Sequence, residues 1–467
     1  MQLMDISGSS LIVGLADHAF VLTSQQNPKQ TLVIELLASK SEITDNVNED
    51  DCKKAQRARK RVTGEDNDDE GSGQDDNDDE DASSNGKILV VALSRSTHDG
   101  TMLCAVARAD KSVSLYQCVI NEVMEGSQLI KILPYMVHRA SKRISSIIFS
   151  QFPSQTADTT ILLVGDALGD VFAFPVSKEC PPGIRRHLLG HTASVITSIR
   201  VIAPSARRNM QILSADRDEK IRISSFPDAY KIDGYLLGHE EFISDMDVKI
   251  VSTLGKEYIL CVSCSGDMTL RLWDVNDFSE ISTLIPRNGN TKLEREDELN
   301  IDDGGRLVPF KLSMNVSVSL LAVIYEDANH VDIVRIVGPW NSDCLQTSMN
   351  KIQSISCKYR PIGVNFQNDN TLFVLMQGSG FLARYDLLMD DTVIDVVSIE
   401  DCSLCHALRH NVENQIISFP STISDMRKLN RKIPRTEKHR TPGQQLPERV
   451  KLLKQKGARR KRKFRDK

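Results

Sequence analysis

The sequence predicts an all-β protein in which four-stranded sheets stand side by side in a ring, the arrangement of a β-propeller. Residues 190–224 and 238–274 carry this prediction. Each segment opens with Gly-His, continues with alternating apolar and polar residues, and closes with a strand in which an Arg separates two apolar residues. The two starting points are 48 residues apart, close to the ~40–45 residues of a repeat that forms one propeller blade.

The second segment ends with Trp273-Asp274, and Gly-His followed by Trp-Asp is typical of WD40 repeats. We expect His239 and Asp267 to share a buried hydrogen-bond chain with a strand serine and the Trp273 indole. Such a chain stabilises a blade when every member has a partner. In the first segment the same interpretation pairs His191 with Asp218, and Ser224 stands where the tryptophan would be.

The N-terminal part predicts the start of the propeller. Strand-like runs occupy residues 9–23 and 32–37, so residues 1–43 are expected to supply a closing strand and the first blade. Because ring closure removes exposed sheet edges, we expect the N-terminal strand to pair with the C-terminal blade. Residues 44–86 lack apolar runs, and residues 65–81 hold eleven Asp or Glu with no Lys or Arg. This composition predicts a disordered, charged insertion.

Strand-like runs resume at residue 87, so residues 87–424 are expected to form the remaining blades. Without insertion and tail about 380 residues remain, enough for seven or eight blades, and the long loops favour a seven-bladed WD40 propeller. From Arg427 to Lys467 there are eighteen Lys or Arg against three acidic residues. Residues 425–467 are therefore expected to be a basic, disordered tail.

The sequence offers little support for an enzyme or a metal protein. The glycine cluster at 377–380 has no following helix and is interpreted as a hairpin turn. Cys261 and Cys264 are three residues apart in a predicted strand, which directs their side chains to opposite faces. With Cys104 and Cys118 they are expected to be small core residues, and Cys402-x-x-Cys405-His406 is isolated, so no metal site is predicted. No apolar run approaches the ~18–20 residues of a membrane span, and an early Asp5 argues against a signal peptide.

Two charged segments exceed what a generic blade needs. Five of the six residues from Asp216 to Ile221 are charged. They suit either a solvated turn that caps the blade or a docking loop whose mixed charges select a partner. The tail sequence ARRKRKFRDK suits either a nuclear-import signal or an arm that binds RNA phosphates, and residues 53–61 are a second import candidate.

The segment ILSADRDEKIRIS at 212–224 is followed by LGHEEFISDMDV at 237–248. Together with the turn at 169–172 and the basic tail, these segments resemble the WD-repeat non-catalytic subunit of the tRNA guanine-N7 methyltransferase, whose insect members are called Wuho. The resemblance implies a chain that is not an enzyme and that binds and stabilises a catalytic subunit as a heterodimer. The complex would transfer a methyl group from S-adenosylmethionine, bound by the partner, to N7 of a guanine in the tRNA variable loop.

The resemblance also assigns residues. The contact loop maps onto Arg217, Asp218, Glu219, Lys220 and Arg222, and Arg222 is expected to reach a partner carboxylate. Candidate tRNA contacts in the tail are Arg459, Arg460, Lys461, Arg462 and Lys463. This chain is expected to hold no cofactor and to act in the nucleus, with the cytoplasm as an alternative. The competing function is a general WD40 scaffold such as a ubiquitin-ligase substrate receptor. Those receptors commonly end a repeat with Trp-Asp-x-Arg, where this chain has Asn276.

Overall fold

In the computed structural model every described element is a β-strand, and the strands form seven four-stranded antiparallel sheets. The structure describes residues 4–7, 10–15, 18–24, 31–36, 87–94, 101–123, 127–152, 159–176, 185–192, 194–203, 210–253, 255–287, 307–340, 347–377, 382–389 and 394–399. The predicted insertion at 44–86 and the predicted tail at 425–467 lie outside these residues.

The first three sheets are formed from the N-terminal part of the described chain. The first contains β1 (Met4–Ser7), β2 (Ser10–Leu15), β3 (His18–Ser24) and β4 (Thr31–Leu36). The second contains β5 (Ile88–Leu93), β6 (Thr101–Arg108), β7 (Ser112–Val123) and β8 (Ser127–Arg139). The third contains β9 (Ile144–Phe152), β10 (Thr159–Asp166), β11 (Asp170–Pro175) and β12 (Arg186–Gly190).

The other four sheets follow in chain order. The fourth contains β13 (Ile196–Ile202), β14 (Met210–Asp216), β15 (Lys220–Phe226) and β16 (Ile232–Leu237). The fifth contains β17 (Ile243–Thr253), β18 (Lys256–Ser265), β19 (Leu270–Asp274) and β20 (Ser279–Leu284). The sixth contains β21 (Pro309–Met314), β22 (Leu320–Tyr325), β23 (His330–Val337) and β24 (Ser348–Ser356). The seventh contains β25 (Pro361–Phe366), β26 (Thr371–Met376), β27 (Leu382–Met389) and β28 (Ile394–Ile399).

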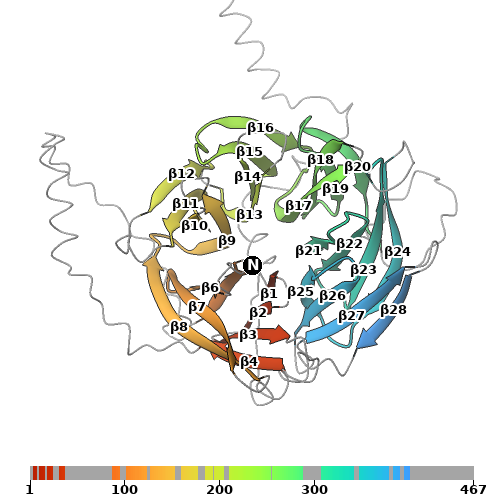
Figure 1. Ribbon diagram of the computed structural model, residues 1–467. Helices are drawn as coiled ribbons and strands as arrows, with labels where there is room; N and C mark the ends of the chain where they lie inside the picture. The colour runs from red at the N-terminus through yellow and green to blue at the C-terminus, as the bar shows by residue number, and fades with distance from the viewer. Residues whose placement is uncertain are drawn as a thin grey trace, which may run out of the picture. The chain divides into compact units, whose positions relative to one another are not determined.

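Each sheet is a meander in which consecutive strands pair, with the first strand innermost and the fourth outermost (Figure 1). The tight turn between the second and third strands needs a residue in the left-handed region. Lys111, Glu219, Met268 and Asp327 adopt it with φ of 67°, 76°, 66° and 60°. The third sheet uses Gly169 instead, with φ of 102°, and a Cβ there would lie 2.6 Å from the backbone oxygen of His191. Glycine is therefore required at that turn.

The innermost strands close the ring. β1 contacts β5 on one side and β25 on the other, and each further inner strand contacts the next. The expectation that the N-terminal strand pairs with the C-terminal blade is wrong. Met4 pairs with Val13 and Ser7 with Ser10, both in β2, while the seventh sheet is complete within β25–β28. Pairing β1 with β2 closes a loop of only two residues, so the local hairpin costs less chain entropy than a partner across the sequence.

Closure instead depends on side chains at the centre. Met4 is buried, and a Cβ placed on Gly363 of β25 would lie 3.6 Å from its Cβ. Asp5 accepts a hydrogen bond at 2.8 Å from the backbone N–H of Leu93 in β5. Asp247 does the same at 3.0 Å for Met314 in β21. These bonds join inner strands of neighbouring sheets that share no backbone ladder.

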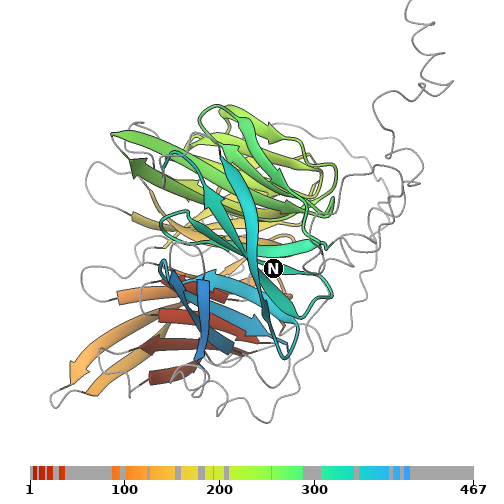
Figure 2. The same cartoon turned by 90° about the vertical axis from the view of Figure 1, so that its right-hand side faces the viewer.

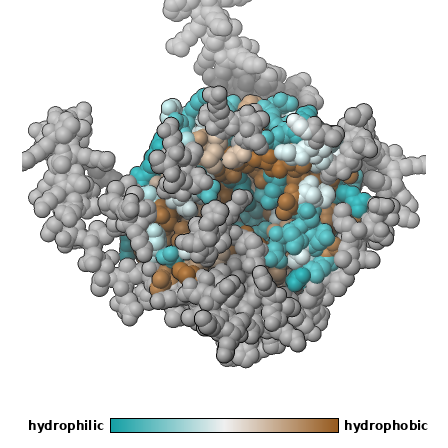
Figure 3. Space-filling view, in the orientation of Figure 1, coloured by the Kyte–Doolittle hydropathy of each residue, from teal (hydrophilic) through white to brown (hydrophobic). Residues whose placement is uncertain are grey.

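Figure 2 shows the sheets after a quarter turn from the view of Figure 1. Apolar side chains pack in the spaces between neighbouring sheets. Along β18, side chains alternate between the two faces of the sheet. Cys261 packs in the cluster shared with the fourth sheet, and Cys264 packs in the cluster shared with the sixth. Both thiols are fully buried, as are Cys104 and Cys118, so the prediction that these four are core residues is confirmed. On the face seen in Figure 3, hydrophobic residues reach the surface between hydrophilic ones.

Candidate partner-docking surface

The turns between second and third strands and the connections between sheets form one surface, which we call the turn face. The connection from the third to the fourth sheet shows how it is built. The His191 N–H donates to the backbone oxygen of Gly169 at 2.9 Å, and the Arg217 N–H donates to that of Val195 at 3.0 Å. One connection thus bonds to the turns of both sheets that it joins, so residues of neighbouring blades form a continuous surface.

The charged turn of the fourth sheet is held by the carboxylate of Asp216. Its Oδ1 accepts hydrogen bonds from the N–H groups of Asp218 (2.9 Å) and Lys220 (3.0 Å). The Asp218 N–H also lies 3.2 Å from Oγ of Ser194 in the preceding connection. Because side-chain oxygens of Asp216 and Ser194 hold the backbone of the turn, its conformation is preorganised, which lowers the entropic cost of binding.

The predicted pairing of His191 with Asp218 is wrong. Nδ1 of His191 lies 2.7 Å from Oδ2 of Asp216, and its Nε2 lies 2.7 Å from Oγ of Ser214. Asp216 is the last residue of β14 and precedes Asp218 by two positions. Its Oδ1 accepts the N–H groups of the turn, and its Oδ2 faces His191. The third sheet has the same arrangement at its turn. Asp166 ends the second strand, and its Oδ1 accepts hydrogen bonds from the N–H groups of Leu168 and Asp170.

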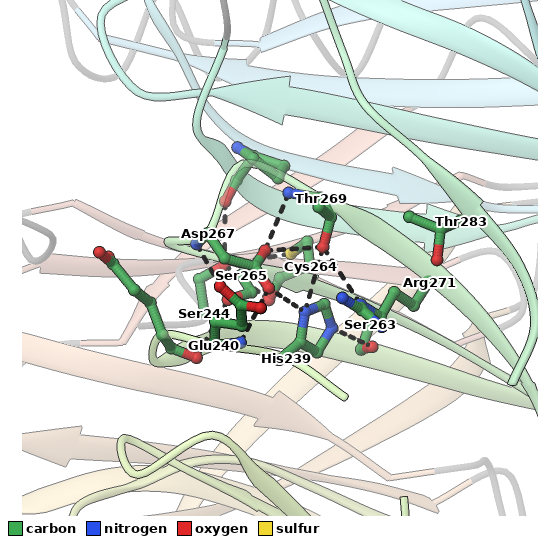
Figure 4. A network of polar contacts seen from close by, with 12 residues as sticks. His239, Glu240, Ser244, Ser263, Cys264, Ser265, Asp267, Thr269, Arg271 and Thr283 are labelled. Atoms are coloured by element: carbon green, nitrogen blue, oxygen red, sulfur yellow. Dashed lines mark hydrogen bonds and ion pairs between the residues drawn. The ribbon is translucent and has the colours of Figure 1, made fainter. Parts of the chain in front are cut away.

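The fifth sheet has the predicted chain of hydrogen bonds (Figure 4). Nδ1 of His239 lies 2.9 Å from Oδ2 of Asp267, and its Nε2 lies 2.7 Å from Oγ of Ser263. The Trp273 indole N–H donates to the same Oγ at 2.8 Å. Burial would raise the pKa of Asp267, but hydrogen bonds from His239, Thr269 and a backbone N–H outweigh it and hold the pKa at about 2. Here the predicted roles of His239, Asp267 and Trp273 are confirmed.

Because Asp216 meets the structural need, the side chain of Asp218 is left at the surface. It is 46% exposed, and its Oδ1 lies 3.6 Å from Nε of Arg217. Lys220 is exposed, Glu219 is half-buried, and Arg217 is mostly covered. The turn therefore presents charges of both signs within four consecutive residues. Such a pattern discriminates between partners and fixes their orientation more than it adds raw affinity.

Arg222 is not part of this exposed group. Its side chain is buried, and it donates to Oγ of Ser224 (2.9 Å) and to the backbone oxygens of Gly190 (3.1 Å) and Ala229 (2.8 Å). These contacts within the blade do not include a partner carboxylate, and the expectation that Arg222 reaches one stays a prediction. Alternation along β15 turns Arg222 inward, where it ties the connection at Gly190 to the hairpin that follows β15.

An apolar edge beside the turn was not apparent from the sequence. Lys220 pairs with Leu237 and Arg222 with Tyr235 in β16, the outermost strand of the fourth sheet. Leu237 is 62% exposed and Tyr235 is 38% exposed. Protein interfaces commonly combine aromatic or apolar anchors with a polar rim. The signal in the sequence is the run Ile-Asp-Gly-Tyr-Leu-Leu, which becomes informative only once β16 is known to be an edge strand.

The remaining site predictions fall partly outside the described residues. Arg459, Arg460, Lys461, Arg462 and Lys463 lie there, as do Cys402, Cys405 and His406. Among the described residues, no group of three or more His, Cys, Asp or Glu side chains is arranged to hold a metal ion. No helix long and apolar enough to cross a membrane occurs in the described part of the chain.

Curated relatives of this chain share a common name. A protein of Aedes aegypti named tRNA (guanine-N(7)-)-methyltransferase non-catalytic subunit wuho is 33% identical over 196 residues, which are 42% of this chain and 43% of the relative. The protein of that name from Culex quinquefasciatus is 28% identical over 299 residues, 64% of this chain and 63% of the relative. The non-catalytic subunit TRM82 of Kluyveromyces lactis is 31% identical over 187 residues, 39% of this chain and 38% of the relative.

The matched regions span between about two fifths and just under two thirds of the length of these relatives. A family model covers more of the chain. The family described as the tRNA methyltransferase TRM82 WD40 domain matches residues 28–185 and 177–378. These residues include five complete sheets, the second to the sixth, together with the strands β4, β25 and β26. The predicted WD40 propeller is thereby confirmed, and the chain belongs to the TRM82 WD40 domain family.

Proposed function

We propose that this chain is the non-catalytic subunit of a tRNA guanine-N7 methyltransferase, and that it binds and stabilises a separate catalytic subunit. The observation that carries the proposal is membership of the TRM82 WD40 domain family. Relatives in insects and yeast bear the name of that non-catalytic subunit. The described structure supplies a suitable surface, because hydrogen bonds to Asp216 hold the charged turn and its Asp218 and Lys220 side chains are exposed.

The docking surface in this proposal consists of the exposed turn residues Asp218 and Lys220 with the neighbouring edge residues Tyr235 and Leu237. Arg217 and Glu219 belong to the same turn and shape its charge. A partner with complementary charges would meet the turn, while its apolar side chains would cover Leu237. Burial of an exposed leucine contributes about 1.5–3 kcal/mol when it is complete, so the apolar edge supplies affinity and the turn supplies orientation.

The chemistry in this proposal belongs to the partner. The catalytic subunit would bind S-adenosylmethionine and transfer its methyl group to N7 of a guanine in the tRNA variable loop, and this chain would hold no cofactor. Catalysis needs a precisely positioned site. A subunit that restrains the fold of the enzyme can therefore raise its activity without touching the substrate. We also propose a nuclear location, on the basis of the basic segments at 53–61 and 451–467.

A matched pair of substitutions tests the docking surface. Lys220→Glu reverses a charge on the turn, and Lys231→Glu reverses one in the hairpin between β15 and β16, at the other end of the same sheet. Both lysines are exposed. We expect Lys220→Glu to reduce co-purification of the catalytic subunit and guanine-N7 methylation of tRNA, and Lys231→Glu to change neither. Equal behaviour of the two variants would contradict the assigned surface.

The tail requires a separate test. We propose that Arg459, Arg460, Lys461, Arg462 and Lys463 bind tRNA phosphates, with nuclear import as the alternative role. Removal of residues 427–467 should lower the tRNA affinity of the heterodimer if the first role holds. Mislocalisation in cells with unchanged tRNA affinity would support the second role and exclude the first. For the protein as a whole, a cullin adaptor in place of a methyltransferase in pull-downs would support the general scaffold instead.

A further inference from the structure

Arg108, the last residue of β6, is a buried arginine whose hydrogen-bond donors are only partly used. The residue is 5% exposed. Its Nη1 donates to Oγ of Ser114 at 2.8 Å. Within the described structure its Nε and Nη2 have no hydrogen-bond partner, and both atoms are buried. Leaving a buried donor without an acceptor costs free energy, and the cost is larger when the donor carries a charge.

Two other buried cations of the described chain have partners that Arg108 lacks. Arg222 donates to a hydroxyl and to two backbone oxygens, and Nζ of Lys311 lies 3.3 Å from Oδ2 of Asp245. By contrast, no carboxylate of the described residues forms an ion pair with Arg108. A buried charge without a counter-charge is unfavourable, so this position favours the binding of an anion.

The acid closest to Arg108 in the sequence is Asp110, in the turn that follows β6. Its side chain already serves that turn, because Oδ1 accepts hydrogen bonds from the N–H and the hydroxyl of Ser112, at 3.0 and 2.6 Å. Asp110 is exposed, whereas the guanidinium of Arg108 is buried. The turn therefore does not supply the counter-charge.

The two unused donors are the pair that suits an oxyanion. Nε–H and Nη2–H project from one edge of the planar guanidinium, and Nη1 on the other side is held by Ser114. One oxyanion can accept two parallel hydrogen bonds from such an edge. The bond to Ser114 also restrains the plane of the group, which lowers the entropic cost of binding.

Arg108 lies between the first and second sheets. Ala107, just before it, and Val113, just before Ser114, pack in the cluster shared with the third sheet. Side chains alternate along a strand, so Arg108 and Ser114 lie on the opposite face of the second sheet. The first sheet packs on that side, where β2 contacts β5 and β4 contacts β8 (Figure 1).

A second arginine rises from the same face. The Lys111 N–H donates to the backbone oxygen of Arg108 at 3.1 Å, which closes the turn and sets Ser112 beside Arg108. Ser112 pairs with Arg139 in β8. Directly opposed residues of antiparallel strands share a face, so Arg139 lies in the same row, two strand spacings or about 10 Å from Arg108 between Cα atoms. Arg139 is exposed, and it forms no ion pair with the described residues.

We propose that Arg108, with Arg139 at the rim, binds a free inorganic oxyanion of the size of phosphate, and that the bound ion stabilises the packing of the first sheet on the second. Two guanidinium groups balance the charge of a dianion such as hydrogen phosphate, whereas a carboxylate would balance only one. Because Nε and Nη2 have almost no exposed surface, the site admits a single small ion and excludes a phosphate that is attached to a polymer. The proposal is independent of the proposed function.

The test uses the full chain, with potassium phosphate as the probe. Calorimetric titration should give one phosphate per chain. A ligand that binds only the folded state raises the unfolding midpoint, and we expect a rise of about 2 °C at ten times the dissociation constant for a chain of this size. Because phosphate also stabilises proteins by being excluded from their surface, the reference is Arg108→Met in the same phosphate, and potassium chloride of equal ionic strength is the second reference.

Arg108→Met should abolish the binding and the specific rise. In chloride it should unfold at the same temperature as the wild type or higher, since it replaces an unpaired buried charge with an apolar chain. Arg108→Lys keeps the charge but lacks the two parallel donors, and it should weaken phosphate binding roughly tenfold. Arg139→Met should weaken the binding without abolishing it.

The control is Arg143→Met, which removes an exposed arginine from the connection between the second and third sheets. It should leave the stoichiometry and the rise unchanged. Equal rises in the wild type and Arg108→Met overturn the proposal, and so does loss of phosphate binding in Arg143→Met. An Arg108→Met chain that fails to fold in chloride also overturns it, because Arg108 would then have an essential partner within the protein.

Discussion

His191 and Asp216 face each other across the connection from the third to the fourth sheet, with 2.7 Å between Nδ1 and Oδ2. Both side chains are almost fully buried. Since Asp216 already accepts the contact from His191, the carboxylate of Asp218, two residues later, has no part in the hydrogen bonds that hold the blade together. One aspartate thus has a structural role and the other is available to a partner.

The two aspartates should therefore separate stability from docking. Asp216→Ala removes the partner of His191, takes the acceptor from the Lys220 N–H, and leaves the Asp218 N–H with only Oγ of Ser194. It should destabilise the chain by about 2–4 kcal/mol. Asp218→Ala should change stability by no more than about 0.5 kcal/mol and should weaken binding of the catalytic subunit. Urea unfolding of the isolated chain and titration of the partner measure the two effects. A large stability loss for Asp218→Ala would contradict this division.

Arg222 should affect folding and not docking directly. Arg222→Met keeps much of the apolar volume but leaves the backbone oxygens of Gly190 and Ala229 without their donor. We expect a loss of about 2–4 kcal/mol, seen as a lower midpoint in thermal or urea unfolding. Lys220→Met on the same strand, where the side chain is exposed, is the matched control and should be near neutral. Full stability of Arg222→Met with a failed heterodimer would instead restore Arg222 to the interface.

The apolar end of β16 should be a binding determinant. Leu237→Asp places a charge beside the docking turn, whereas Ile232→Asp places one at the far end of the same strand, where the isoleucine is 44% exposed. We expect the first to weaken the heterodimer by about 1–3 kcal/mol and the second to have little effect. Both isolated chains should stay folded, because neither side chain is part of the core. Calorimetric titration with the catalytic subunit gives the comparison.

His138 should make stability depend on pH. The residue is 1% exposed, the centroid of its ring lies 4.6 Å from that of Phe174, and neither ring nitrogen has a hydrogen-bond partner within the described structure. Burial lowers the pKa of His138 from 6.5 to about 4. Between these values the unfolded chain binds a proton that the folded chain does not, so stability falls as the pH falls from 6.5 towards 4. The full contribution is about 3 kcal/mol at about 1.4 kcal/mol per pKa unit.

The measurement compares the wild type with His138→Phe, which keeps an aromatic ring against Phe174. The comparison is needed because another group titrates with the opposite sign. Burial raises the pKa of Asp5 from 3.8 to about 6, so this carboxyl favours the folded state as the pH falls from 6 towards 3.8. Both chains contain Asp5, and the difference between them isolates His138. Parallel stability curves from pH 7 to pH 4 would exclude the assigned role.

The predicted propeller followed from local patterns. Alternating apolar residues and turn residues at regular intervals specify strands and hairpins, since each can be read within about ten residues. The hydrogen-bond chain of His239, Asp267 and Trp273 was equally accessible, because the fifth sheet keeps the residue types of the repeat at their usual spacing. The fourth sheet departs from that spacing at Asp216, and the sequence then favoured the wrong aspartate.

By itself the sequence determined the class of fold, the core cysteines and the segment that forms the charged turn, because these depend on residue type and on periods of a few residues. Only the tertiary structure decided the direction of each side chain within that segment. It placed Arg222 inside the blade and Asp218 outside it, exposed Leu237 on an edge strand, and buried Arg108 without a carboxylate partner among the described residues. These outcomes depend on which sheets pack side by side. They also depend on whether His191 contacts the carboxylate of Asp216 or that of Asp218. The spacing of residues along the chain specifies neither.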